Sequence, residues 1–214
     1  MKNIAIYGAG GFGREVACTI NKINEVEPTW NLIGFFDDGV EKGKMISHFG
    51  PILGGMADLN AYQDEINVVI AIGNPLTVKK VVEQISNGNV KFPNLIHPNT
   101  HYSDKETFSI GKGNIVQGGC SFSCDVRIGN FNVFNGDLVL GHDVSVGNFN
   151  AFMPAVRISG EVSIGNCNFF GVSSIVLQQL KIKDNVRLAA GSVLMTKPKE
   201  NNLYIGVPAK LQKF

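Results

Sequence analysis

From position 110 onward, every sixth residue of the sequence is apolar, and this period restricts the fold more than any other feature. The run has no exception over fifteen positions: Ile110, Val116, Phe122, Ile128, Phe134, Leu140, Val146, Phe152, Ile158, Ile164, Phe170, Val176, Ile182, Leu188 and Leu194. A second period of 18 residues lies over the first, with Gly-Asn pairs at Gly129-Asn130, Gly147-Asn148 and Gly165-Asn166. Three six-residue sides per turn describe a triangular parallel β-helix, in which each apolar residue points inward.

This coil should contain five turns, without an inserted loop between residues 110 and 199. No single turn is stable alone, so stacking must bury one continuous core, with Phe134, Phe152 and Phe170 aligned along the axis. Glycine and asparagine tolerate positive φ better than other residues, so we expect the Gly-Asn pairs to occupy the corners in that conformation.

Residues 1 to about 95 follow a different pattern, in which short apolar strands alternate with helices. Strands are predicted at 4–7, 32–36, 68–72 and 92–96, and helices after the glycine cluster at 8–13 and from Pro75. This alternation indicates a small parallel sheet covered by helices. The chain should therefore divide into an α/β domain over residues 1–96, equivalent to about half of a Rossmann fold, and an all-β parallel-helix domain with a C-terminal tail over residues 97–214.

The composition narrows the class of protein. The 214 residues include 19 Lys and Arg against 18 Asp and Glu, and 44% are hydrophobic. This hydrophobic content is typical of a globular chain. The near-neutral charge balance gives no sign of a basic surface that would bind nucleic acid or an anionic membrane. No apolar run is long enough to span a bilayer and the first residues do not resemble a signal peptide, so we expect a cytoplasmic protein. The four cysteines form no C-x-x-C pair and should be reduced, as small buried residues rather than nucleophiles.

A glycine cluster, Gly8-x-Gly10-x-x-Gly13, follows the first strand and opens the first helix. Such a turn can bind phosphates at the helix N-terminus, and the alternative is that it serves only as a tight strand-to-helix turn. A dinucleotide fold needs two such halves, so a mononucleotide or nucleotide sugar is favoured over NAD. Asp37 and Asp38 end the second strand, where they either bind a base or ribose or have a purely structural role.

His142 is the only histidine inside the repeats, and it lies two positions after the inward Leu140. It should therefore face outward, either as a solvated surface residue or as a general base, because a neutral imidazole titrates near working pH. Asp143 would orient this ring or stabilise its cation. A β-helix zinc enzyme would need about three imidazole ligands, and the other histidines precede the coil, so we expect no catalytic metal.

The hexad array, His142-Asp143 and Gly206-Val207-Pro208-Ala209-Lys210 together resemble the left-handed β-helix acyltransferases. With Gly8 to Gly13, Phe35-Phe36-Asp37-Asp38 and Ile72-Gly73-Asn74-Pro75, nearly the whole chain resembles the bacterial N-acetyltransferases of nucleotide-linked 4-amino-4,6-dideoxy sugars and the related sialic acid O-acetyltransferases. The resemblance implies a left-handed coil, a homotrimer, and acetyl-CoA bound in the groove between neighbouring coils.

The resemblance also implies roles for individual residues. It assigns the general base to His142, with Asp143 as its partner. The nucleotide sugar would contact Gly10, Gly11, Phe12, Gly13, Asp37, Asp38, Asn74 and Asn135. Acetyl-CoA would contact Gly141, Gly160, Gly171, Ala189, Gly206 and Lys210. Relatives commonly carry a second histidine that bonds the acetyl carbonyl, and the corresponding residue here is Ala151.

We therefore expect direct acetyl transfer from acetyl-CoA to the 4-amino group of a nucleotide-linked amino sugar, with no metal, nucleic acid or membrane involved. O-acetylation of a sugar such as sialic acid is the first alternative. The second is a non-catalytic sugar-nucleotide sensor, which Ala151 would favour. An NAD enzyme has the weakest support.

Overall fold

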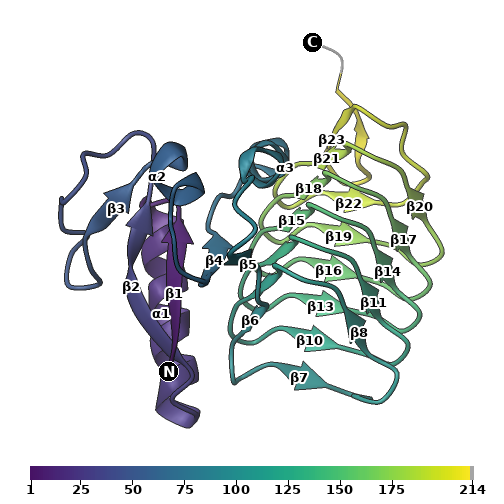
Figure 1. The fold of residues 1–214 in the computed structure, drawn as a ribbon. Helices are drawn as coiled ribbons and strands as arrows, with labels where there is room; N and C mark the ends of the chain where they lie inside the picture. The colour runs from purple at the N-terminus through teal and green to yellow at the C-terminus, as the bar shows by residue number, and fades with distance from the viewer. Residues whose placement is uncertain (213–214) are drawn as a thin grey trace.

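The computed structural model describes residues 1–212, so the last two residues of the predicted C-terminal domain lie outside the described part. An α/β domain lies beside a triangular coil, and the C-terminal segment crosses the far end of that coil (Figure 1). No helix in residues 1–212 is long and apolar enough to cross a bilayer.

The α/β domain contains a five-stranded parallel sheet in the order β3-β2-β1-β4-β5. Its strands are β1 (Lys2–Tyr7), β2 (Trp30–Phe36), β3 (Ile52–Gly54), β4 (Ile66–Ile70) and β5 (Val90–Lys91), and its helices are α1 (Gly11–Val26), α2 (Met56–Asn60) and α3 (Pro75–Gln84). The central strands β1 and β4 are almost continuously apolar because helices or the coil cover both faces of the sheet. The predicted small parallel sheet with helical cover is confirmed.

Three parallel sheets form the sides of the coil, as the six-residue period predicts. The first contains β7 (His101–Tyr102), β10 (Ser121–Phe122), β13 (Val139–Leu140), β16 (Arg157–Ile158), β19 (Ile175–Val176) and β22 (Val193–Leu194). The second contains β8 (Ser109–Ile110), β11 (Arg127–Ile128), β14 (Ser145–Val146), β17 (Ser163–Ile164) and β20 (Lys181–Ile182). The third contains β6 (Leu95–Ile96), β9 (Ile115–Val116), β12 (Val133–Phe134), β15 (Ala151–Phe152), β18 (Phe169–Phe170), β21 (Arg187–Leu188), β23 (Leu203–Ile205) and the antiparallel β24 (Lys210–Leu211).

The coil begins earlier than its period indicates. β6 and β7 precede the first periodic residue, Ile110, and β6 pairs with β9 in the third sheet. The start of β8 follows the start of β7 by 109 − 101 = 8 residues instead of six, so two extra residues conceal this turn from the pattern. The predicted boundary after residue 96 therefore leaves the first coil strand, β6, on the N-terminal side.

Phenylalanine rings stack along the coil axis, which confirms the expected column. Phe134 and Phe152 have ring centroids 5.0 Å apart, and Phe152 and Phe170 have centroids 4.7 Å apart at an interplanar angle of 2°. All three side chains are fully buried.

The corner prediction is wrong in detail. Positive φ falls on Phe131 (54°), Phe149 (58°) and Cys167 (57°), two residues after each glycine of the Gly-Asn pairs. Glycine is needed at position 147 for a different reason, since a Cβ there would lie 2.5 Å from the carbonyl oxygen of Gly165 in the next turn. Close approach of adjacent turns, rather than left-handed backbone, therefore requires these glycines.

The asparagines form two ladders of side-chain hydrogen bonds, which explains why the coil is rich in this residue. In the inner ladder, the amide oxygens of Asn114, Asn132 and Asn150 each accept from the backbone N–H and Nδ2 of the asparagine one turn later. The ladder ends at Asn168, whose oxygen accepts from the N–H of Val186. In the outer ladder the direction is reversed: each side-chain oxygen accepts from the backbone N–H and Nδ2 of the asparagine one turn earlier. The accepting residues are Asn148, Asn166 and, at the end, the carboxylate of Asp184. The inner ladder is buried and the outer one is half-exposed or exposed.

Candidate functional site

The glycine turn after β1 combines structural positions with open ones. Gly8 has φ of 108°, and a Cβ there would lie 2.7 Å from the carbonyl oxygen of Ala71. A Cβ at Gly13 would collide with the carbonyl oxygen of Gly8. Gly10 and Gly11, by contrast, have nothing within 4 Å of a Cβ position. The turn therefore needs Gly8 and Gly13, whereas Gly10 and Gly11 leave room for a ligand to approach the backbone.

The N-terminus of α1 offers unpaired donors to such a ligand. Gly10 is the N-cap residue and supplies no side-chain cap to the helix. The first N–H groups of a helix lack intrahelical acceptors, and the helix dipole favours an anion beside them. The position beside β1 and β4, where the strand order reverses, is where open parallel sheets bind ligands.

The two aspartates that follow β2 bind the chain's own backbone. Asp37 accepts hydrogen bonds from the N–H groups of Ala9 (2.8 Å) and Gly39 (2.9 Å). Asp38 accepts from the N–H of Met56 (2.8 Å) and from the hydroxyl of Tyr7. Burial, and then the hydrogen bond to Asp38, raise the pKa of Tyr7 above its usual value, so this hydroxyl stays protonated and donates. Both carboxylates thus fix the shape of the glycine turn and its neighbouring loop.

A cleft separates α1 from one corner of the coil. Two cavities of about 380 and 310 Å³ make up this cleft, and both are lined by Glu15, Asn135 and Pro154. The smaller cavity also reaches Gly11 and Phe12 of the glycine turn. The structure therefore brings together three of the predicted sugar-contacting residues, Gly11, Phe12 and Asn135, from segments more than a hundred positions apart.

The cleft also contains residues that sequence reasoning missed. Gln117 and Met153 lie one 18-residue turn before and after the predicted Asn135 and line the coil side with it, a spacing that could have identified them. Glu15 lines the helix side and carries no sequence signal for this role. Asn74 is less available than expected, since its side-chain oxygen caps α3.

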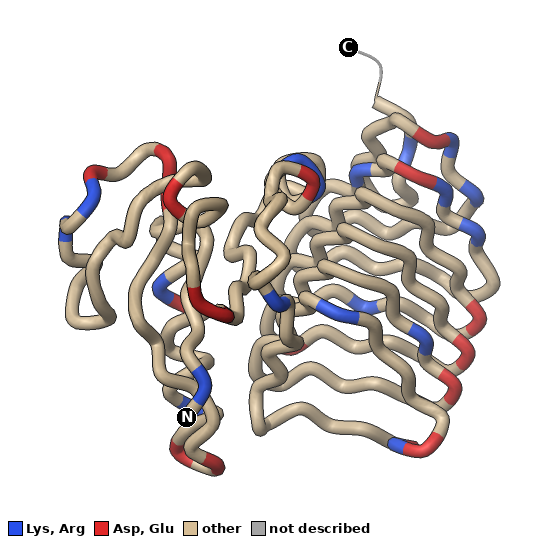
Figure 2. The backbone as a smooth tube through the Cα atoms, in the orientation of Figure 1, with Lys and Arg blue, Asp and Glu red and all other residues tan. Residues whose placement is uncertain are grey.

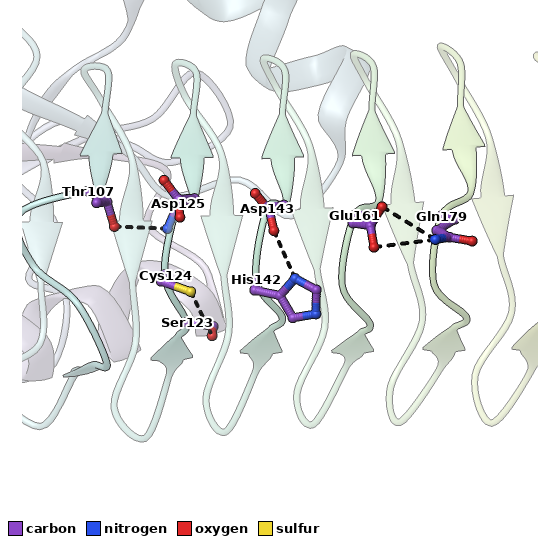
Figure 3. Close-up of polar contacts among 8 residues, drawn as sticks. All are labelled: Thr107, Ser123, Cys124, Asp125, His142, Asp143, Glu161 and Gln179. Atoms are coloured by element: carbon purple, nitrogen blue, oxygen red, sulfur yellow. Dashed lines mark hydrogen bonds and ion pairs between the residues drawn. The ribbon is translucent and has the colours of Figure 1, made fainter.

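His142 and Asp143 form a pair on a different corner of the coil, between β13 and β14. Nδ1 of His142 lies 2.9 Å from Oδ2 of Asp143, and both side chains are more than half exposed (Figure 3). A carboxylate can only accept a hydrogen bond, so Nδ1 must carry the hydrogen, and Nε2 of the neutral ring keeps a free lone pair. The pair therefore has the arrangement of a general base and its orienting acid.

The His142 corner and the cleft do not meet within one chain. The α/β domain lies beside the third sheet of the coil (Figure 1). His142 lies between β13 of the first sheet and β14 of the second. None of the cavity-lining residues of the cleft within residues 1–212 comes from the segment 141–143.

Charged side chains separate along the coil. Acidic residues follow one edge, and Lys and Arg gather near the C-terminal end (Figure 2). Asp125, Asp143 and Glu161 stand one turn apart on that acidic edge, each in a left-handed backbone conformation (Figure 3).

Most residues predicted to contact acetyl-CoA lie toward the C-terminal end of the coil. A Cβ at Gly141 would lie 2.7 Å from the backbone nitrogen of Gly160, and one at Gly171 would collide with the backbone of Ala190. Ala189 donates its N–H to Tyr204 (2.9 Å), and Gly206 (φ 103°) precedes the cis peptide bond at Pro208.

The structure also places Lys210, Ala151 and the cysteines, about which the sequence made predictions. Lys210 is exposed on β24. Ala151, at the position for which the resemblance implies a second histidine, is buried in β15, two residues before the cavity-lining Met153. Cys120 and Cys167 are buried coil residues as expected, but Cys18 is exposed on α1.

Comparison with known proteins identifies relatives of both the sequence and the fold. Residues 3–85 match the family described as the PglD N-terminal domain. A UDP-N-acetylbacillosamine N-acetyltransferase of Bacillus subtilis (strain 168) is 29% identical over 118 residues, which cover 54% of this chain. The aligned region spans about half, 51%, of that enzyme's own length.

Solved structures match the whole chain. The acetyltransferase domain of PglB from Neisseria gonorrhoeae FA1090, in complex with acetyl coenzyme A, has a TM-score of 0.87 at 25% identity and covers 99% of each chain. PerB from Caulobacter crescentus, in complex with CoA and GDP-perosamine, has a TM-score of 0.85 at 24% identity, covering 100% of this chain and 98% of its own. The resemblance to the hexapeptide-repeat N-acetyltransferases of nucleotide sugars is therefore confirmed over the length of the fold, with a PglD-type N-terminal domain at residues 3–85.

Proposed function

We propose that the protein transfers an acetyl group from acetyl-CoA to the 4-amino group of a nucleotide-linked 4-amino-4,6-dideoxy sugar. The observation that carries this proposal is the His142–Asp143 pair, with Nδ1 and Oδ2 2.9 Å apart, on a coil attached to an α/β domain with an open glycine turn. Relatives with this fold are N-acetyltransferases, and one of their structures contains both CoA and a nucleotide-linked amino sugar.

The nucleotide would lie along the end of the parallel sheet. Its phosphates would approach Gly10, Gly11, Phe12 and Gly13 at the N-terminus of α1, where no side chain caps the helix. Asp37 shapes that turn through its bond to the N–H of Ala9, and Asp38 binds the N–H of Met56 at the start of α2. The sugar would then extend into the cleft toward Asn135.

The active site would be completed by a second copy of the chain, because His142 and the cleft lie on different corners of the coil. In a homotrimer, the His142 corner of one copy would face the cleft of its neighbour. Acetyl-CoA would follow the groove between the two coils, past Gly141, Gly171 and Ala189, to the turn from Gly206 to Lys210.

Chemistry would proceed without an acyl-enzyme. The sugar amine attacks the thioester carbonyl, Nε2 of His142 removes a proton from the amine, and the CoA thiolate leaves and takes up that proton. Asp143 holds the ring and stabilises the imidazolium between these steps. Holding both substrates in one groove supplies the orientation that the attack requires.

The test is turnover on a panel of UDP-, dTDP- and GDP-linked 4-amino-4,6-dideoxy sugars, with free-thiol release as the readout and mass spectrometry to locate the acetyl group. His142→Ala should lower kcat by about 10²–10⁴-fold with little change in KM for acetyl-CoA. His101→Ala, an exposed histidine on β7 of the same coil, should leave kcat unchanged.

Three other outcomes contradict parts of the proposal. Thiol release only with sialic acid would assign O-acetylation. A melting shift with UDP or dTDP but none with acetyl-CoA would assign a non-catalytic sensor. Normal turnover by His142→Ala would remove this residue as the base.

A further inference from the structure

The imidazole of His142 extends from its own coil turn toward the next one (Figure 3). The residue that it meets there is Gly160, which follows it by one 18-residue turn. A Cβ built on Gly160 would lie 2.5 Å from Nε2 of His142, 2.6 Å from Cε1 and 2.9 Å from Cδ2. The ring therefore occupies the space that any side chain at position 160 would need.

The backbone conformation does not require glycine at this position, and the nearest atoms to a Cβ there belong to a side chain. Gly160 is absent from the residues with positive φ, so its backbone conformation is open to any amino acid. Its three nearest contacts are all atoms of the His142 ring. Gly147 and Gly129 differ, since a Cβ at either would lie 2.5 Å from a backbone oxygen of the following turn. Stacking of the coil explains those two glycines, whereas a Cβ at Gly160 would first meet the ring of His142.

We propose that Gly160 is the positioning residue for His142. Its missing side chain lets the imidazole lie across the next turn, with Nδ1 on Asp143 and Nε2 in the space that a Cβ at position 160 would need. This role rests on the proposed function, and it is additional to the contact with the pantetheine arm that the resemblance implies for Gly160.

Two constraints then fix the ring. The hydrogen bond to Asp143 selects the tautomer and anchors one edge, and the flat surface over Gly160 receives the other edge. His142 is 55% exposed, so few other contacts restrain it. A methyl group at position 160 would move the ring into solvent and stretch its bond to Asp143. Small displacements of a catalytic group cost up to about 10²-fold in rate.

The experiment compares Gly160→Ala with the matched variant Gly147→Ala. Gly160→Ala displaces only the end of a mobile side chain, so it should leave Tm nearly unchanged while kcat falls by about 10–100-fold, with little change in KM for acetyl-CoA. Gly147→Ala forces a Cβ against the backbone, so it should lower Tm and preserve the pH profile of kcat/KM in the folded protein.

A double-mutant cycle isolates the coupling. In a His142→Ala background, Gly160→Ala should have no further effect on kcat, because no ring remains to be displaced. Unchanged kcat in Gly160→Ala would overturn the proposal. A raised KM for acetyl-CoA with unchanged kcat would also overturn it and assign Gly160 to the pantetheine arm.

A second readout is independent of activity. With histidines labelled by ¹³C, the ring signals of His142, assigned by their loss in His142→Ala, should shift in Gly160→Ala and stay in place in Gly147→Ala. Unmoved signals would overturn the proposal. If His142→Ala keeps full turnover, the general-base assignment fails, and the ring signals still decide whether Gly160 positions His142.

Discussion

Removing one rung of the inner asparagine ladder should destabilise the coil far more than removing the matching rung of the outer ladder. Oδ1 of Asn150 accepts from the backbone N–H of Asn168 at 2.9 Å and from its Nδ2 at 3.0 Å. Asn168 is fully buried, so Asn150→Ala leaves two donors without water or protein partners. At about 1–3 kcal/mol per buried unsatisfied group, the cost is about 2–6 kcal/mol.

The matched control is Asn148→Ala. Oδ1 of Asn148 accepts the same two kinds of bond from Asn130, at 2.8 and 2.9 Å, but this ladder is only half-buried. Water can replace the lost acceptor there, so the cost should be below about 1.5 kcal/mol. Equilibrium urea unfolding at one protein concentration gives both values, provided that the m-values agree. Equal losses in the two variants would refute the argument that burial, rather than bond number, sets the contribution of each ladder.

Three further predictions concern stability and thiol chemistry. Burial, and then the charge of Lys22, lower the pKa of His97, whose Nδ1 also accepts the N–H of Asn99 (3.0 Å). The folded state therefore resists protonation, so the free energy of unfolding should fall as the pH drops below about 6.5. His97→Gln should reduce this loss in urea titrations between pH 5 and 8, and parallel curves would contradict it. Burial raises the pKa of Cys120 to about 12, so an aromatic disulfide reagent should modify exposed Cys18 in the native protein and Cys120 only after unfolding. Phe152→Ala removes a fully buried ring from the axial stack and should cost about 3–5 kcal/mol by chemical denaturation, whereas a loss under 1 kcal/mol would mean that the stack collapses to fill the space.

The coil could be predicted from sequence because each turn repeats the same local packing problem. Inward residues such as Phe152 must be apolar at every sixth position, so the period survives in the sequence. Between β7 and β8 two extra residues interrupt it, and the first turn is hidden. The left-handed corners could not be located, because neighbouring turns hold Phe131 in that conformation although it is neither glycine nor asparagine.

The candidate site was predictable only in part. His142 and the glycine turn carry their chemistry in their own residue types and local spacing. The cleft depends on how α1 lies against the coil, which brings Glu15 to the same cavities as Asn135. No periodicity within either segment records that contact. The role proposed for Gly160 could not be predicted from the sequence either, since it depends on contact with the ring of a residue one turn away.

Because each regular turn of the coil contains 18 residues, the length of the coil is proportional to its number of turns. Stacked strands lie about 4.8 Å apart, so each turn adds one fixed increment along the axis. Under the proposed function, His142 and the turn at Gly206 meet opposite ends of the same acyl donor. The number of turns between them then sets the length of donor that fits. Adding or deleting one complete turn past residue 160 would keep the remaining ladder residues in register and change that length by one strand spacing.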